Sequence, residues 1–280
     1  MLLLVDLDGV VYRGPDPVPG VAEVLARRAR RGDELVFVTN NSMHYRADYV
    51  ARLRSMGLPV TPDRVVSAPR ATALFLVGQA SPPARVLAVG AEGLFRELRD
   101  VGLEVVRSED AAPRAVQERI DGFEAAGRPD TVVVGLDPGL TYGRIAVAAD
   151  AIRAGARFVA TNRDPVYPTE RGLAPGAGSV VAAVEVAAGV APIVVGKPEP
   201  RLLEEAARAG GGLASEAVMI GDGLVTDLAA ARAVGARSVL MLTGVTTREQ
   251  VEALPRGERP TAVAADAEEL EAALDRLAGR

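Results

Sequence analysis

Residues 2–9 of this chain, Leu-Leu-Leu-Val-Asp-Leu-Asp-Gly, join an apolar run to two carboxylates. The run Leu2–Val5 predicts a strand buried on both faces, as in parallel α/β sheets. Open sheets of this kind bind ligands at the carboxyl ends of their strands. Asp6 and Asp8 lie there, and two neighbouring carboxylates are costly to desolvate unless a cation or proton lies between them. The stretch favours a metal-assisted site, although an Asp-Gly turn that only closes a strand is an alternative.

Composition restricts the classes of function that are open. The chain has 280 residues, 49% hydrophobic and 25% charged, which indicates a globular protein of one or two domains. A net charge of −5 without a basic stripe argues against nucleic acid, and no apolar stretch reaches membrane-spanning length. Met1 leads directly into the first strand, so we expect no signal peptide. The lack of cysteine excludes disulfides and fits a cytoplasmic protein, and the single histidine, His44, excludes a multi-histidine metal site.

Strand and helix patterns alternate, which predicts parallel sheets built from βαβ units. The predicted strands cover residues 2–5, 34–38, 65–67, 85–89, 104–106, 131–134, 157–160, 192–195, 217–220, 238–242 and 261–264. The predicted helices cover residues 21–31, 45–56, 93–101, 142–154 and 179–188, and a closing helix is capped by Asp266.

The linker-like stretch at residues 79–83, Gln-Ala-Ser-Pro-Pro, divides this pattern. The simplest arrangement is one domain inserted in another. Residues 1–79 and 191–280 then form a Rossmann-like α/β core, a parallel sheet flanked by helices, and residues 80–190 form an inserted α/β domain.

Three further polar clusters follow predicted strands of the core. Thr39-Asn40-Asn41-Ser42 presents a hydroxyl, amides and backbone N–H groups, which suit an anion, with ordinary helix capping as the alternative. Lys197, in Gly196-Lys197-Pro198, is the only lysine in a chain otherwise rich in arginine. This suggests a position that needs a compact ammonium group, the alternative being a surface lysine.

The last cluster contains Asp222, between two glycines, and Asp227, near the start of the next helix. Its alternative is one turn aspartate and one helix-start aspartate. Acids from two strands, an anion-binding turn and a lysine at one sheet edge suit Mg²⁺, which prefers oxygen ligands, and phosphoryl transfer.

These clusters resemble, in order, the four motifs of the haloacid dehalogenase superfamily of aspartyl phosphatases. Within it the chain is similar to the NagD and 4-nitrophenyl-phosphatase subfamily. The residues that carry this closer similarity are Asp8–Gly14, Thr161–Asp164 and Pro175–Gly178, ahead of Gly196-Lys197-Pro198. The resemblance covers essentially the whole chain and implies that the insert is a cap that closes over the site.

The resemblance implies a role for each motif residue. Asp6 would be the nucleophile that becomes an aspartyl-phosphate, and Asp8 the general acid and base. Mg²⁺ would bind to Asp6, to the backbone carbonyl of Asp8, and to Asp222 and Asp227, the last directly or through water. The groups that hold the phosphoryl oxygens would be Thr39, Asn40, Asn41 and Lys197.

The cap would select the substrate, a small phosphorylated metabolite, through Asn162, Asp164 and Tyr167. Related pyridoxal phosphatases carry a histidine where this chain has Tyr167, which argues against a vitamin phosphate. A cytoplasmic homodimer that pairs through the cap is a further expectation. A phosphotransferase or mutase on the same fold, a dehalogenase, and a non-catalytic sensor of phosphate ligands are the alternatives; Asp8 argues against the dehalogenase.

Overall fold

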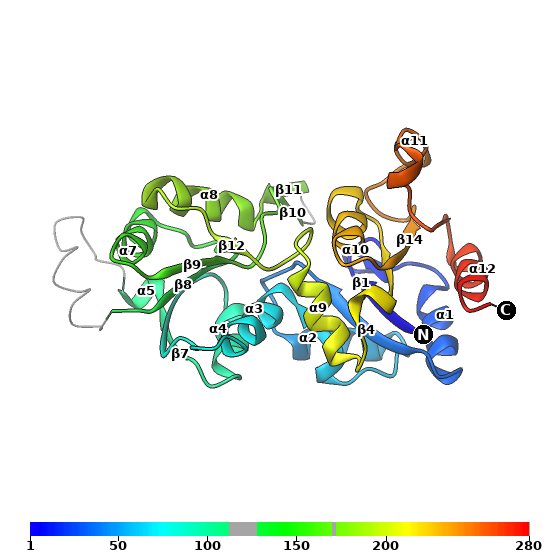
Figure 1. The fold of residues 1–280 in the computed structure, drawn as a ribbon, viewed down its shortest axis with the longest axis horizontal. Coiled ribbons are helices and arrows are strands. Elements are labelled where there is room, and N and C mark those ends of the chain that lie inside the picture. Colours follow the sequence, from blue (N-terminus) through cyan, green and yellow to red (C-terminus); the bar gives the residue numbers. More distant parts are fainter. Residues whose placement is uncertain (112–127, 170–171, 280) are drawn as a thin grey trace. The chain divides into compact units, whose positions relative to one another are not determined.

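The computed structural model describes residues 1–111, 128–169 and 172–279, and Figure 1 shows its helices and strands. Contacts divide the chain into two compact units. The first consists of Met1–Thr39, Ala47–Ser67 and Lys197–Arg280, and the second of Asn40–Arg46 and Ala68–Gly196.

In the described part of the first unit, six parallel strands form one sheet in the order β15-β14-β13-β1-β4-β5. Their bounds are β1 (Leu2–Asp6), β4 (Glu34–Thr39), β5 (Val65–Ser67), β13 (Val218–Gly221), β14 (Arg237–Met241) and β15 (Ala262–Ala264). Strand β1 pairs with β13 on one side and β4 on the other, and Leu3, Leu4 and Val5 are fully buried. Because the strands are parallel, their carboxyl ends meet at one edge of the sheet.

The helices of this unit are α1 (Val21–Arg30), most of α2 (Arg46–Ser55), α9 (Arg201–Ala209), α10 (Ala229–Ala233), α11 (Arg248–Glu252) and α12 (Ala267–Leu277). A short hairpin, β2 (Tyr12–Arg13) and β3 (Asp16–Pro17), follows β1. Helix α12 begins as predicted, since the Asp266 side chain accepts a hydrogen bond from the Glu269 N–H. Its Leu270 and Leu274 are buried in the main core of the unit.

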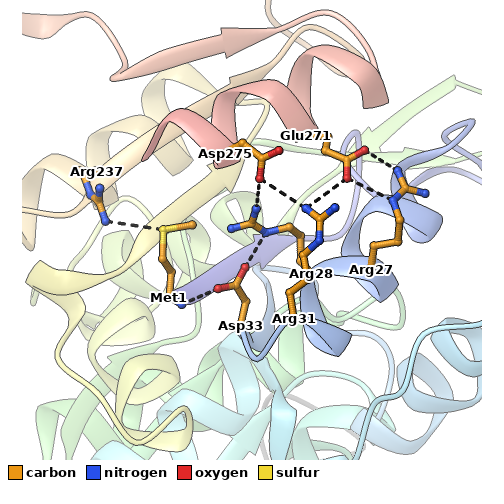
Figure 2. A network of polar contacts seen from close by, with 8 residues as sticks. All are labelled: Met1, Arg27, Arg28, Arg31, Asp33, Arg237, Glu271 and Asp275. Carbon is orange, nitrogen blue, oxygen red and sulfur yellow. Dashed lines mark hydrogen bonds and ion pairs between the residues drawn. The ribbon is translucent and has the colours of Figure 1, made fainter. Parts of the chain in front are cut away.

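A network of charged groups joins α1 to α12 (Figure 2). The fully buried Arg28 side chain donates from Nε to Asp33 Oδ2 (2.5 Å) and from Nη1 to Asp275 Oδ1 (2.6 Å). The amino group of Met1 donates to the other Asp33 oxygen at 2.5 Å. We call Met1, Arg28, Asp33 and Asp275 the helix-pairing network; Arg31 also donates to Asp275 Oδ1 at 3.4 Å, so each carboxylate of the network has two positive partners.

The described part of the second unit has a five-stranded parallel sheet in the order β12-β9-β8-β6-β7. Its strands are β6 (Arg85–Val89), β7 (Glu104–Arg107), β8 (Thr131–Val134), β9 (Arg157–Ala160) and β12 (Ile193–Val194). The helices are α3 (Ala68–Val77), α4 (Glu92–Arg99), α5 (Ser108–Ala111), α7 (Tyr142–Arg153) and α8 (Ala177–Ala188), with a hairpin of β10 (Val166–Thr169) and β11 (Gly172–Pro175). Both units are therefore α/β, as predicted from the sequence.

One predicted strand belongs to a different sheet from the one expected. Strand β12, predicted at residues 192–195 within the core, pairs with β9 in the second unit because its backbone continues that sheet. Contacts also place α3 in the second unit. The limits expected for the inserted domain, residues 80–190, stay a prediction. Among the described residues, no helix is both long and apolar enough to cross a membrane.

Candidate active site

Three carboxylates meet at the carboxyl edge of the six-stranded sheet. Asp6 is the last residue of β1, Asp222 follows β13, and Asp227 lies in a π-helical turn, Leu224–Leu228. One oxygen from each lies within 4.8 Å of the others, and all three residues are buried. The turn holds Asp227 in place, because its Oδ2 accepts hydrogen bonds from the N–H groups of Asp222 (3.2 Å) and Gly223 (2.9 Å).

Lys197 lies among these acids, with its side chain 3% exposed. Its Nζ donates to Asp6 Oδ1 at 2.5 Å and to Asp227 Oδ1 at 2.6 Å. The only lysine of the chain therefore lies at the carboxyl edge of the six-stranded sheet, beside Asp6 and Asp227. It arrives there from β12, a strand of the second sheet, rather than from a core strand.

Burial and mutual repulsion control the charges of this cluster. Burial raises the pKa of the Asp6 carboxyl well above its usual value; Lys197 opposes that rise, and Asp227 and Asp222 add to it. The pKa of Asp222 is raised to about 6, mainly by burial and secondly by the negative charge of Asp227. Burial alone would lower the pKa of Lys197, but Asp227 and Asp6 outweigh it and raise that pKa overall, so the ammonium stays charged.

The donor set suits a divalent metal ion. Three ionised carboxylates and one ammonium leave a formal net charge of −2 in a buried place. A divalent cation would cancel that charge, and clustered carboxylate oxygens are the ligands that Mg²⁺ prefers. The residues present therefore fit Mg²⁺.

A loop that the sequence analysis missed also surrounds Asp222. It follows β14 and contains Thr243, Gly244, Val245 and Thr246. The Val245 N–H donates to Asp222 Oδ2 (2.8 Å), and the Thr246 hydroxyl donates to the Asp222 carbonyl (2.5 Å). The rule that parallel strands place their carboxyl ends at one edge could have identified this loop, since β14 is the neighbour of β13.

Asp8 and Thr39 lie at or just after the carboxyl ends of β1 and β4, and they differ in exposure. Asp8 follows β1 by two residues, is partly exposed, and is not a member of the three-carboxylate cluster. Its backbone forms a bridge with Tyr12 at the start of the hairpin. Thr39, the last residue of β4, is 2% exposed.

The other predicted residues belong to the second unit. The Asn40 Nδ2 donates to both carboxylate oxygens of Asp164, at 3.1 and 3.0 Å. The Asn162 Nδ2 donates to the Asn40 carbonyl at 2.7 Å. Asn41 Oδ1 accepts from the Met43 N–H at 2.9 Å, and Tyr167 is partly exposed on β10. The predicted phosphate-binding turn is thus divided between the units after Thr39.

Known proteins match this chain over most of its length. Residues 3–104 match the family model "Haloacid dehalogenase-like hydrolase", and residues 194–270 match a second, "HAD-hydrolase-like". A D-glycerol 3-phosphate phosphatase of Mycobacterium tuberculosis is 42% identical over 265 residues, which are 94% of this chain and 69% of that protein.

Two solved structures extend the similarity to the fold. A p-nitrophenyl phosphatase of Archaeoglobus fulgidus superposes with a TM-score of 0.83 at 33% identity, over 97% of this chain and 98% of that one. A glycerol phosphate phosphatase of M. tuberculosis in complex with magnesium gives 0.81 at 39% identity, over 96% and 75%. The chain belongs to the haloacid dehalogenase-like hydrolases, as a phosphoric monoester hydrolase of the NagD and p-nitrophenyl phosphatase-like family with an inserted cap domain.

Proposed function

We propose that this enzyme hydrolyses small organic phosphate monoesters in two steps, with Asp6 as the nucleophile. The observation that carries the proposal is the position of Asp6, buried at the end of β1 with the Lys197 ammonium 2.5 Å from one of its oxygens. A buried lysine beside a carboxylate supplies positive charge where the phosphoryl oxygens would lie.

In the first step a carboxylate oxygen of Asp6 bonds to phosphorus, and the bond from phosphorus to the ester oxygen breaks. Asp8 donates its proton to that leaving oxygen, which departs as the alcohol. In the second step Asp8 takes a proton from water as the water oxygen attacks phosphorus, and the Asp6 carboxylate leaves. Phosphate and the starting protein result, so protons and charges balance.

Other side chains of the site would bind and orient the phosphoryl group. We assign this role to Lys197 and to Thr39, Asn40 and Asn41, whose hydroxyl, amide and N–H groups are hydrogen-bond donors. Mg²⁺, when bound by Asp6, Asp222, Asp227 and the Asp8 carbonyl, supplies positive charge that offsets the charge of the phosphoryl group.

The substrate is proposed to be a small phosphorylated metabolite selected by the cap through Asn162, Asp164 and Tyr167. Glycerol phosphate is the first candidate, because a relative at 42% identity is a D-glycerol 3-phosphate phosphatase. Sugar phosphates, nucleotides and pyridoxal phosphate complete the panel to be compared by kcat/KM.

Phosphate release measured with and without EDTA, in wild type and in Asp6→Asn, tests the mechanism. We expect EDTA to abolish release, and Asp6→Asn to lower kcat by about 10⁴-fold or more, as loss of a nucleophile does. Asp16→Asn, the same substitution at an exposed position of β3, is the control and should retain wild-type turnover. Full activity in Asp6→Asn, or turnover in EDTA, would contradict the proposal; phosphate passing to a second organic acceptor would identify a transferase.

We further infer a cytoplasmic homodimer that pairs through the cap. The second unit supports this with exposed apolar side chains on its hairpin and on α8, namely Val166, Leu173 and Val186. Light scattering coupled to size-exclusion chromatography tests the association, and a monomer at micromolar concentration would contradict it.

A further inference from the structure

We infer that the loop after β14, residues 243–246, positions the metal site and sets its affinity for Mg²⁺. This rests on the proposed function, because Asp222 and the peptide after Asp8 matter here as parts of a cation site. None of the four loop residues is proposed to touch substrate or metal; they act through Asp222 and Gly9.

The first pair of contacts holds both the side chain and the main chain of Asp222. Its carboxylate oxygen Oδ2 accepts the Val245 N–H, and its main-chain carbonyl accepts the Thr246 hydroxyl. Thr246 is itself 5% exposed and Asp222 6%, so water has little access to replace either bond. Together these bonds restrain the main chain and the carboxylate of a proposed metal ligand.

The second contact joins the loop to the residue that follows Asp8. The buried Thr243 hydroxyl donates to the Gly9 carbonyl at 2.6 Å. Gly9 has a φ of +82°, a conformation that suits glycine, and it continues the chain from the Asp8 carbonyl proposed to bind the cation. Thr243 therefore restrains the turn on which that carbonyl lies.

Close packing supports the same role. A Cβ on Gly9 would lie 2.3 Å from Asp222 Oδ2, and a Cβ on Gly244 would lie 1.8 Å from the same oxygen. Loops from β1 and β14 thus enclose Asp222 so tightly that its carboxylate has little room to move. Groups that hold metal ligands in this way commonly govern metal affinity.

The residue that follows the loop provides a matched control. Thr247 is the N-cap of α11, where its hydroxyl accepts a hydrogen bond from the Gln250 N–H in a capping box. This role is structural, so Thr247→Val should lower stability without changing the site. Thr243→Val and Thr246→Val also replace a hydroxyl by a methyl group of similar size, but at positions where the hydroxyl donates to Gly9 or Asp222.

Mg²⁺ binding to EDTA-treated, substrate-free protein, measured by isothermal titration calorimetry, tests the inference without relying on turnover. We expect Thr243→Val and Thr246→Val each to raise the Mg²⁺ Kd by about 10- to 100-fold, as loss of such supporting groups does. Thr246→Ser should restore most of the affinity, and Thr247→Val should stay within about twofold of wild type. Circular dichroism confirms that each variant is folded, and Thr243→Ala and Thr246→Ala, which also lack the hydroxyl, replace any valine variant that is not.

The outcomes separate the two proposals. If wild type binds Mg²⁺ and the folded variants that lack the hydroxyl at residue 243 or 246 bind it equally well, this inference is wrong and the proposed function stands. If wild type binds no Mg²⁺, the proposed metal site fails and the inference fails with it. A loss of affinity in Thr247→Val as large as in Thr246→Val would also overturn the inference, because the loop would then act only through general stability.

Discussion

The first unit contains two clusters of buried charge, the helix-pairing network and the candidate active site. In the network, Arg28 and the Met1 amino group face Asp33 and Asp275, and Arg31 adds a positive charge beside Asp275, so no negative charge is left uncompensated. In the site, Lys197 faces three carboxylates, and two negative charges remain. Both clusters are made from the same kinds of group, with similar distances between charged atoms.

The difference shows how a structural ion cluster is distinguished from a functional one. Buried charges are tolerated in a folded protein when partners neutralise them. Where the chain leaves charge uncompensated at the end of a sheet, the missing partner is expected to be a ligand. The pKa of Asp222, raised to about 6 by burial and by Asp227, is the physical sign of that imbalance.

Removing the positive charge from the site should have the largest effect. Lys197→Met deletes the ammonium that contacts Asp6 and Asp227, and we expect kcat/KM to fall on the order of 10³-fold. Lys197→Arg keeps the charge in a larger planar group, and its kcat/KM should lie between those of wild type and Lys197→Met. Steady-state assays at saturating Mg²⁺ measure this, and near-normal turnover in Lys197→Met would remove lysine from the mechanism.

Changes in the helix-pairing network should alter stability and not catalysis. Arg28→Met leaves Asp33 and Asp275 without their buried partner, and we expect the free energy of unfolding to fall by about 3–5 kcal/mol. Urea denaturation measures the loss, and kcat/KM per folded molecule should be unchanged. Arg27→Met is the control, because its pair with Glu271 is much more exposed and should matter far less. Equal losses in the two variants would show that burial does not decide the effect.

Mg²⁺ should stabilise the folded protein through the candidate active site and not through the helix-pairing network. At a Mg²⁺ concentration 100 times its Kd, we expect the free energy of unfolding to rise by about 3 kcal/mol, since only the folded state binds. Asp222→Asn should lose this Mg²⁺-dependent increase. Arg28→Met should show the full increase, although its free energy of unfolding without Mg²⁺ is lower than that of wild type. Urea unfolding with Mg²⁺ and with EDTA gives both values, and an increment in Asp222→Asn equal to that of wild type would exclude Asp222 as a ligand.

Glu97, a buried carboxyl of the second unit, should give the smallest effect and one that depends on pH. Burial raises its pKa above the ordinary 4.5, with Arg46 and Arg70 opposing the rise. The folded state therefore binds this proton more tightly than the unfolded chain, so its contribution to stability is present below pH 4.5 and is lost as pH rises through the folded-state pKa. As pH rises above 4.5, Glu97→Gln should lose less stability than wild type. The exposed Glu92→Gln is the control, and parallel pH profiles for wild type and Glu97→Gln would contradict the pKa shift.

Several elements followed from local sequence alone. The strands at residues 65–67, 85–89, 131–134 and 157–160 were predicted with their observed bounds, because short continuous apolar runs specify strands buried on both faces. Asp6, Asp222 and Asp227 were grouped because parallel strands share one carboxyl edge. Lys197 was grouped with them on the expectation that its strand lay in the core, which the pairing of β12 with β9 contradicts.

Other features depend on contacts that no local pattern records. Helix α3 is apolar over most of its surface and so lacks a clear helical period. Helix α9 is an exception, because its buried Leu202, Leu203 and Ala206 have the helical spacing and a local pattern could have predicted it. The two-residue strand β12 could have joined either sheet, and only its pairing with β9 decides which. The bond from Thr243 to Gly9 joins residues 234 positions apart, beyond the reach of any local signal.

The change of unit between Gly196 and Lys197 has a consequence for engineering this enzyme. Gly196 is hydrogen-bonded to Thr161 in the second unit, and the next residue places its ammonium 2.5 Å from Asp6. A chimera that grafts a foreign cap therefore has to rejoin the host chain before this junction. A splice that slips by one residue would shift the lysine Cα by about 3.8 Å, enough to withdraw the ammonium from both carboxylates.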